Sequence, residues 1–304
     1  MNDPIRIVEV GPRDGLQNEN QHLSVATRLE LIARLARAGL KQIEVGAMVS
    51  PRRVPQMAES AEVMLALDAG GPVRYSVLVP NLQGLDAAWT AGARDIAIFG
   101  SASESFSQHN IQTSIAESLK TYEPVVRQAL DSGVRVRGYV SCVAGCPYEG
   151  AIAPEQVAMV AGALYNMGCE EISLGDTIGC GTPRSILEML DAVSRVVPLR
   201  QLAGHFHDTR GMALVNIQAS LNAGIRCFDA SVGGLGGCPY APGASGNVAT
   251  EEVVYLLQGL GLNCEIDLAA LIDTAWFICA ALGRPPSAKL ARSQRPGTYS
   301  ANPH

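Results

Sequence analysis

Short runs of apolar and β-branched residues alternate with longer amphipathic runs along the whole of this 304-residue chain. The short runs recur at a spacing of roughly 30 residues, which is the length of a strand–helix–strand unit. These runs are rich in β-branched and other apolar residues, as expected of strands. They predict strands at Ile5–Val10, Gln42–Val45, Arg74–Val79, Asp95–Phe99, Val134–Ser141, Glu171–Leu174, Gln201–His205 and Cys227–Ser231.

The amphipathic runs between these strands predict helices. In the first of them, Leu29, Ile32 and Leu35 fall on one face at helical spacing. Gly39 follows as a stop signal. The same pattern predicts helices at Gln56–Leu67, Leu82–Ala91, Ser114–Asp131, Pro154–Met167, Pro183–Val197, Met212–Ala223 and Val248–Leu260.

Alternation of strands and helices indicates an α/β protein with a parallel sheet. Eight units without a linker favour a closed (β/α)8 barrel, the TIM barrel, over an open doubly wound sheet. An open sheet would more often carry a G-x-G-x-x-G turn after its first strand, where this chain has GPRDG. We therefore assign residues 1–283 to a single barrel with an additional C-terminal helix at Asp267–Gly283. Residues 284–304, rich in Pro and Ser, are expected to form a partly disordered tail.

Composition narrows the class of protein further. The formal net charge is −6 and no tract is basic, which argues against nucleic acid or an anionic membrane as a partner. No run reaches the apolar length of a membrane span, and we find no signal-peptide pattern. The 8 cysteines follow no disulfide pattern, so we expect reduced thiols in a cytoplasmic protein.

Polar side chains follow several predicted strands, at the edge where barrel enzymes carry their catalytic groups. Arg13, Asp14 and Gln17 come after the first strand, Glu44 ends the second, and Asp176 follows the sixth. Titratable groups at the ends of apolar strands are costly unless they pair or bind something. Three of them have a purely structural alternative to a role in the site. Asp14 and Asp176 could be helix caps, and Glu44 could be an ion-pair partner.

The segment GHFHD at the end of the seventh strand is the most informative stretch of the chain. His205 and His207 are two residues apart, so in an extended strand both imidazoles point to the same face. Together with Asp14 and Asn247 they would supply a mixed nitrogen and oxygen ligand set for a hard or borderline divalent cation. The alternative is a polar strand end without a metal.

A glycine-rich loop runs from Gly233 to Asn247 after the eighth strand. We expect it to be a mobile lid, with a plain connector as the alternative. Cys238 within it is a candidate reactive thiol. None of the lysines falls at the end of a predicted strand, so a Schiff-base mechanism is disfavoured and carbonyl chemistry would have to be metal-assisted.

Four long segments resemble the 3-hydroxy-3-methylglutaryl-CoA (HMG-CoA) lyase family. They are Val10–Glu19, Val136–Gly150, Gly168–Pro183 and Ser231–Glu251. The resemblance runs over nearly the whole chain. The GGCPY loop separates it from related synthases that condense acetyl-CoA with keto acids, which share the barrel and the His-x-His pair.

The resemblance implies a carbon–carbon lyase that cleaves HMG-CoA to acetyl-CoA and acetoacetate, with Mg²⁺ or Mn²⁺ as the divalent cofactor. It implies chemistry of the leucine-degradation and ketone-body type, and a homodimer. The implied metal ligands are Asp14, His205, His207 and Asn247. The other implied site residues are Arg13 and Gln17 for substrate binding, and Cys238, His205, Asp176 and Glu44 for catalysis.

The implied reaction is a retro-Claisen cleavage. The metal lowers the pKa of the substrate's C3 hydroxyl, and Asp176 or His205 removes its proton. The C2–C3 bond then breaks, Arg13 stabilises the thioester enolate, and His205 or Cys238 protonates it.

Two departures from the family pattern concern the acyl group. Asn20 stands where the family often has Lys, and Arg210-Gly211-Met212 stands where it usually has Tyr-Gly-Gln. Arg210 adds a cation that would bind a phosphate or carboxylate of the substrate, or make a surface pair. The alternatives are therefore the same lyase chemistry on another 3-hydroxyacyl-CoA, an acetyl-CoA-condensing synthase, and a non-catalytic barrel that only binds ligands.

Overall fold

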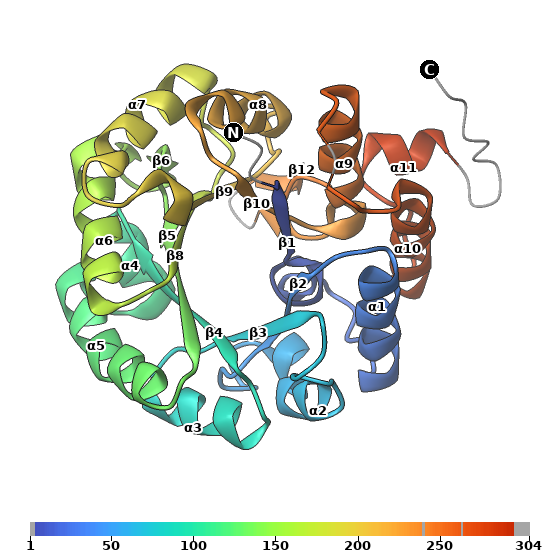
Figure 1. Cartoon of the computed structure of the whole chain (residues 1–304), viewed down its shortest axis with the longest axis horizontal. Coiled ribbons are helices and arrows are strands. Elements are labelled where there is room, and N and C mark those ends of the chain that lie inside the picture. Colours follow the sequence, from blue (N-terminus) through green and yellow to red (C-terminus); the bar gives the residue numbers. More distant parts are fainter. Residues whose placement is uncertain (1–3, 239–240, 263, 295–304) are drawn as a thin grey trace.

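The computed structural model describes residues 4–238, 241–262 and 264–294. Its strands close into a parallel barrel in the order β1, β10, β9, β8, β5, β4, β3, β2, which confirms the predicted (β/α)8 fold (Figure 1). The barrel strands are β1 (Arg6–Glu9), β2 (Gln42–Ala47), β3 (Arg74–Leu78), β4 (Asp95–Ser101), β5 (Arg135–Ser141), β8 (Glu171–Asp176), β9 (Leu202–Phe206) and β10 (Cys227–Ala230).

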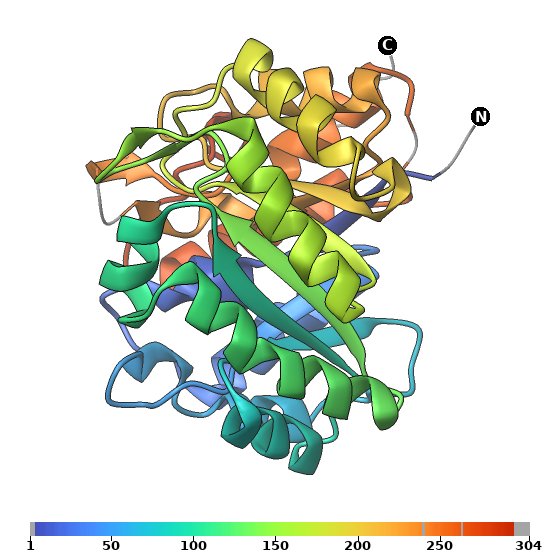
Figure 2. The same ribbon diagram turned by 90° about the vertical axis from the view of Figure 1, so that its left-hand side faces the viewer.

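A ring of helices covers the outer face of the barrel. Figure 2 shows α5 and α6 lying across the strands on one side. The helices of the ring are α1 (Val25–Arg37), α2 (Ser60–Leu65), α3 (Leu82–Thr90), α5 (Ile115–Asp131), α6 (Pro154–Met167), α7 (Pro183–Ser194), α8 (Ala213–Ala223) and α9 (Thr250–Gly259). The additional helix is α10 (Leu268–Ala281), which packs against α1 and α9.

Local sequence signals explain where several helices begin and end. The side chains of Ser24, Asn81 and Ser114 each accept a backbone N–H from the first turn of the helix that follows. Gly168 and Gly224 end α6 and α8 in the left-handed region, with φ of 112° and 107°. These positions match the predicted boundaries to within a few residues.

Several short elements were not predicted. A helix, α4 (Glu104–Ile111), lies between β4 and α5, and a π-helical turn, Gly11–Gly15, follows β1. Two antiparallel hairpins pair β6 (Gly145–Cys146) with β7 (Gly150–Ala151), and β11 (Gly237–Cys238) with β12 (Ala241–Ser245). Part of the predicted tail folds as α11 (Lys289–Ser293), whereas residues 295–304 lie outside the described part of the chain.

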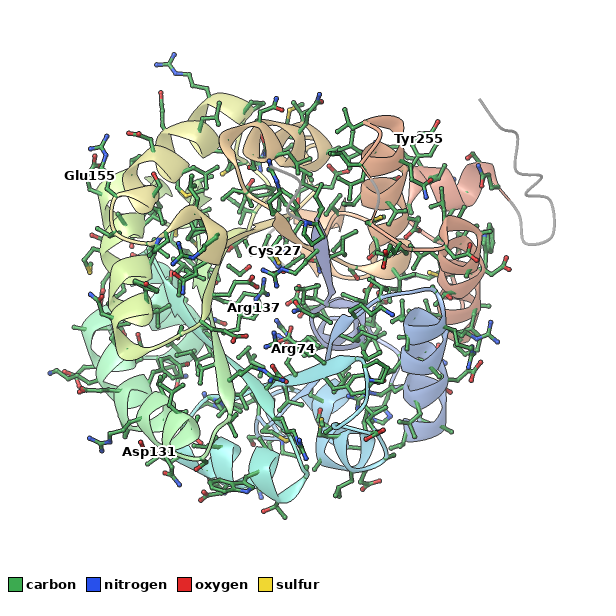
Figure 3. All side chains as sticks on the ribbon, in the orientation of Figure 1. Arg74, Asp131, Arg137, Glu155, Cys227 and Tyr255 are labelled. Atoms are coloured by element: carbon green, nitrogen blue, oxygen red, sulfur yellow. The ribbon has the colours of Figure 1, made fainter. Side chains whose placement is uncertain are left out.

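Charged side chains fill the N-terminal half of the barrel lumen. Arg137 and Cys227 point into the lumen from β5 and β10 (Figure 3). Arg137 pairs with Glu171 at 2.9 Å, and Arg135 pairs with Asp95 at 2.6 Å. These buried carboxylates thus have arginine partners, which offsets the cost of removing their charge from water.

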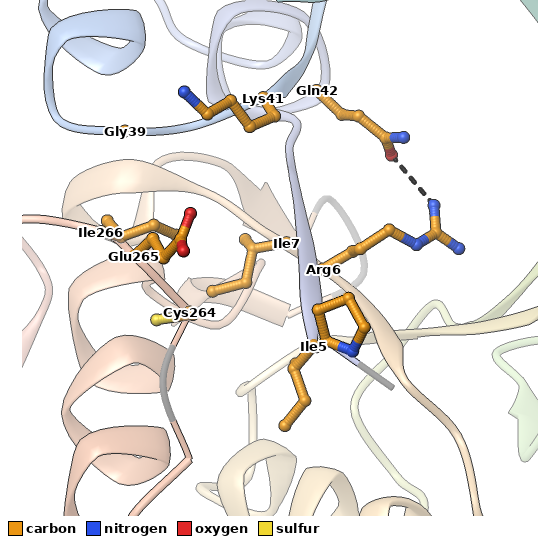
Figure 4. A pocket seen from close by; sticks show the side chains of 10 residues that line it. Ile5, Arg6, Ile7, Gly39, Lys41, Gln42, Cys264, Glu265 and Ile266 are labelled. Carbon is orange, nitrogen blue, oxygen red and sulfur yellow. Dashed lines mark hydrogen bonds between the residues drawn. The ribbon is translucent and has the colours of Figure 1, made fainter. Parts of the chain in front are cut away.

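A pocket of about 380 Å³ opens at the N-terminal end of the barrel (Figure 4). Ile7 of β1 and Ile5, just before this strand, line it together with Lys41, Glu265 and Ile266. It lies at the opposite end of the strands from the residues predicted to carry the chemistry. In the part of the chain that the structure describes, no helix is both long and apolar enough to span a membrane.

Candidate active site

The π-helical turn after β1 places Arg13 and Asp14 at the C-terminal mouth of the barrel. Pro12 lies in its first turn, and the N–H of Gly15 donates to the carbonyl of Val10 at 3.1 Å. A Cβ on Gly15 would lie 2.6 Å from the hydroxyl oxygen of Ser231 and 2.8 Å from Cβ of Leu235. Glycine is therefore required for the turn to approach the segment that follows β10.

Three of the predicted ligands meet at this mouth. Nε2 of His205 lies 3.4 Å from Nε2 of His207 and 4.0 Å from Oδ2 of Asp14. One ligand atom from each of the three residues lies within 4.8 Å of the others, so together they could hold a metal ion. Two imidazole nitrogens at this separation can both present lone pairs only when a cation lies near both of them.

Asn247 joins this cluster from the far end of the glycine-rich loop. It forms an isolated antiparallel bridge with His207, and its Nδ2 donates to Oδ2 of Asp14 at 2.8 Å. The same nitrogen lies 3.4 Å from the carbonyl oxygen of Leu235. The structure thus brings all four predicted ligands together, although they come from three separate loops.

Arg13 is held beside the ligands by two carboxylates. Its Nε donates to Oε2 of Glu44 at 2.7 Å, and its Nη1 donates to Oδ1 of Asp14 at 2.7 Å. The hydroxyl of Tyr139 donates to the same oxygen of Glu44 at 3.3 Å. The other oxygen of Glu44, Oε1, is buried and lacks a partner among the described residues.

A second layer of residues supports His205, and sequence analysis missed it. Nδ1 of His205 lies 3.0 Å from Oδ2 of Asp229 on β10. Arg137 donates to both oxygens of Asp229 at 3.0 and 2.7 Å, and to the hydroxyl of Tyr139 at 2.9 Å. Arg137 and Tyr139 are two residues apart on one strand, and that spacing is the signal from which they could have been found.

Electrostatics keep Asp14 ionised and His207 neutral, the protonation states in which each binds a metal. Burial would raise the pKa of Asp14, but the charges of Arg13 and the two histidines lower it to about 2. Burial and the neighbouring His205 lower the pKa of His207 to about 4. Burial also lowers the pKa of His205, but the hydrogen bond to Asp229 and the charges of Asp229 and Asp14 together outweigh this and raise the pKa above its ordinary value.

The remaining predicted residues lie around this centre. Both oxygens of Asp176 accept backbone N–H groups, from Cys180 at 3.0 Å and Gly181 at 2.7 Å. Burial raises the pKa of Asp176. The cap of α7 is Thr182 and not Asp176, which therefore shapes the loop before the helix. Gln17 lies just beyond the π-helical turn and is partly exposed.

Two predicted features of the loops have different outcomes. The backbone of Cys238 belongs to β11, but its side chain lies outside the described part of the structure. Arg210 is exposed, and its Nη1 donates to the carbonyl oxygen of Ile178 at 2.7 Å. It therefore bridges the loops after β8 and β9.

A pocket of about 260 Å³ opens beside Asn247, with Asp208 and Lys289 in its lining.

Comparison with known proteins identifies the family. The HMGL-like family model matches residues 4–278. The chain belongs to the HMGL-like family. Within it, a hydroxymethylglutaryl-CoA lyase of Pseudomonas mevalonii is 55% identical over 296 residues, which cover 96% of this chain and 98% of that protein. The resemblance found in the sequence is therefore confirmed.

Two further matches come from Pseudomonas aeruginosa. A 3-hydroxy-3-isohexenylglutaryl-CoA/hydroxymethylglutaryl-CoA lyase is 54% identical over 289 residues, 95% of this chain and 96% of that protein. The crystal structure of a hydroxymethylglutaryl-CoA lyase matches with a TM-score of 0.94 at 54% identity, covering 96% of this chain and 98% of that one. The (β/α)8 architecture described above is thus that of the family.

Proposed function

We propose that this protein is a divalent-metal-dependent carbon–carbon lyase that cleaves HMG-CoA to acetyl-CoA and acetoacetate. The observation that carries the proposal is the convergence of Asp14, His205 and His207 at the barrel mouth, with Arg13 bound to Asp14 at 2.7 Å. Relatives more than half identical to this chain are named for this activity.

The residues present fit a resident cation. Asp14, His205, His207 and the amide oxygen of Asn247 would hold it. This donor set contains no thiolate, and its oxygen share suits Mg²⁺ or Mn²⁺. When bound, such a cation polarises the oxygens of the acyl group and lowers the pKa of the C3 hydroxyl.

Arg13 supports the bond-breaking step. As the C2–C3 bond breaks, its electron pair moves onto the thioester and negative charge develops on the carbonyl oxygen. A guanidinium already fixed by Glu44 and Asp14 stabilises that charge without reorganising in the transition state. Glu44 thus contributes by holding the guanidinium of Arg13 in place. Gln17, which follows just after the turn, would contact the substrate from the rim of the barrel mouth.

Proton transfer needs a base at the C3 hydroxyl and an acid at the enolate carbon. Asp176 and His205 are the candidates for the base, and His205 and Cys238 for the acid. Nδ1 of His205 faces Asp229, so only Nε2 of this ring is available to a ligand or a proton. Burial raises the pKa of Asp176, which makes its carboxylate a stronger base than an exposed one.

The same chemistry on another 3-hydroxyacyl-CoA is the second candidate function. It is favoured by the name of the Pseudomonas aeruginosa relative, which includes a longer isohexenyl substituent at C3. The predicted cytoplasmic location, homodimer and place in leucine degradation stay predictions beside this proposal.

The test is incubation of the purified protein with a panel of 3-hydroxyacyl-CoA esters and Mg²⁺ or Mn²⁺, followed by mass spectrometry of the product acids. We expect turnover of HMG-CoA that EDTA abolishes and that His207→Ala lacks. Turnover of a longer ester but not of HMG-CoA would support the second candidate. Release of free CoA from acetyl-CoA and a keto acid would indicate a synthase, and binding without turnover would indicate a non-catalytic barrel.

A further inference from the structure

The two histidines at the end of β9 are held in different ways. Nδ1 of His205 lies 3.0 Å from Oδ2 of Asp229. Nδ1 of His207 is buried and has no hydrogen-bond partner among the residues that the structure describes. The Nε2 atoms of the two rings meet at 3.4 Å. The ring of His205 is therefore held at Nδ1 by a carboxylate, whereas the ring of His207 has no such contact among the described residues.

Asp229 is itself held by residues from two other strands. Its Oδ1 accepts from Nη2 of Arg137 at 2.7 Å. Its Oδ2, which faces His205, accepts from the hydroxyl of Ser173 at 2.7 Å and from Nη1 of Arg137 at 3.0 Å. A guanidinium has donors only, whereas a serine hydroxyl and a histidine ring nitrogen can each donate or accept. Arg137 and Ser173 together thus set the orientation of the carboxylate.

We propose that Asp229 is a positioning residue that sets the tautomer of His205. It accepts the proton on Nδ1 and so leaves the lone pair of Nε2 facing Asp14 and His207, where the divalent cation binds. The inference rests on the proposed metal-dependent function. A carboxylate behind a ligating histidine contributes roughly 10–100-fold to metal affinity, because it fixes both the ring and its tautomer.

The near-isosteric variant Asp229→Asn tests the tautomer directly. Only Arg137, which cannot accept, faces Oδ1 at 2.7 Å, whereas the Ser173 hydroxyl and Nδ1 of His205 beside Oδ2 can both accept. We therefore expect the Asn oxygen at the Oδ1 position and its NH₂ group toward His205, with loss of the 3.0 Å bond from Nη1 of Arg137. An NH₂ group can only donate to Nδ1, and this moves the ring proton to Nε2. The lone pair then points away from the metal site, although the packing of the lumen is retained.

The control is Asp95→Asn at the other end of the lumen. Asp95 is a buried carboxylate that accepts from Arg74 at 2.9 Å and from Arg135 at 2.6 Å, but no histidine faces it among the described residues. The variant therefore removes the same negative charge from another buried carboxylate that arginine side chains hold. Any general loss of stability caused by the missing carboxylate appears in both variants.

Binding of Mn²⁺ to the parent and both variants is measured by electron paramagnetic resonance of the free ion. We expect binding about 10–100-fold weaker in Asp229→Asn and unchanged in Asp95→Asn. Equal binding by the parent and Asp229→Asn, or equal losses in both variants, would overturn the tautomer role and leave the metal site intact. A parent that binds no Mn²⁺ would overturn the proposed function as well.

Nitrogen-15 NMR of the histidines in the metal-free proteins at about pH 8 reports the tautomer of each ring. The tautomer would not change if Asp229 only stabilised the fold. We expect the imidazole of His205, assigned separately from that of His207, to be protonated at Nδ1 in the parent and at Nε2 in Asp229→Asn. An unchanged tautomer would contradict the proposal even if metal affinity fell.

Discussion

Asn247 and Asp14 are 233 positions apart in the chain, yet Nδ2 of the first donates to Oδ2 of the second at 2.8 Å. The contact joins the loop after β10 to the turn after β1 across the closing seam of the barrel. If the amide turns over, two oxygens face each other at this point, and only a cation between them would make that favourable. The orientation of Asn247 is therefore coupled to metal binding.

This coupling predicts the behaviour of Asn247→Asp. In the metal-free protein the new carboxylate repels Asp14, so we expect a stability lower by on the order of 1 kcal/mol, which lowers the melting temperature by about 2 °C in a chain of this length. Saturating Mn²⁺ should raise the melting temperature of the variant by more than that of the parent. Calorimetry with and without Mn²⁺ checks both, and an equal rise in the two proteins would contradict the coupling.

Arg13 should contribute to catalysis more than to substrate binding. In Arg13→Met we expect kcat to fall by roughly 10²–10³-fold with a small change in KM, as when one charge-stabilising donor is lost. The variant also leaves Glu44 buried without its partner, which costs about 3–5 kcal/mol of stability. Arg13→Met/Glu44→Gln should recover stability without activity. Recovery of both would show that Arg13 has a structural role only.

Gly15 is predicted to tolerate no side chain. In Gly15→Ala the new Cβ would lie 2.6 Å from the Ser231 hydroxyl and 2.8 Å from Cβ of Leu235. We expect a loss of about 1–3 kcal/mol in the free energy of unfolding, measured with urea. Gly259→Ala in α9 is the matched control, because nothing lies within 4 Å of its new Cβ. Equal effects of the two substitutions would refute the close approach.

Stability should also depend on two buried carboxyl groups behind the glycine-rich loop. Glu9 accepts from the N–H of Val232 at 2.9 Å, and Glu251 accepts from the N–H of Gly233 at 3.0 Å. Burial raises the pKa of Glu9 to about 7 and that of Glu251 to about 8, both from an ordinary value of 4.5.

Since both pKa values are raised on folding, the stabilisation is complete below about pH 4.5 and is lost as the pH rises through about 7 and 8. For these two groups we expect the free energy of unfolding to fall between about pH 5 and pH 8, and the fall to be smaller in Glu9→Gln/Glu251→Gln. Urea unfolding at several pH values checks this. An equal dependence of the free energy of unfolding on pH in parent and variant would show that Glu9 and Glu251 do not cause the fall.

Much of the fold and of the site could be predicted from the sequence. Each barrel strand falls at a predicted run, because strands are rich in β-branched and other apolar residues and the helices between them are amphipathic. Asp14, His205, His207 and Asn247 were predicted together because the C-terminal ends of parallel strands share one mouth. The π-helical turn after β1 was missed, since its Gly and Pro residues also suit an ordinary loop.

The support behind His205 could not be predicted in the same way. Asp229, Arg137 and Ser173 come from three strands, and which of their side chains meet depends on the stagger of those strands around the barrel. A single sequence predicts which residues of a strand share a face. It does not predict how that strand is aligned with the strands beside it. Helix α4 was missed because its residues, ESFSQHNI, show little helical periodicity.

The most direct test of the lyase assignment is cleavage of HMG-CoA in D₂O with Mg²⁺ or Mn²⁺ present. The account predicts equal amounts of acetyl-CoA and acetoacetate, with one solvent deuterium in the acetyl methyl group, because the enolate carbon takes its proton at the site after the C2–C3 bond breaks. Hydrolysis of the thioester to free CoA, or no reaction although the cation binds, would contradict it.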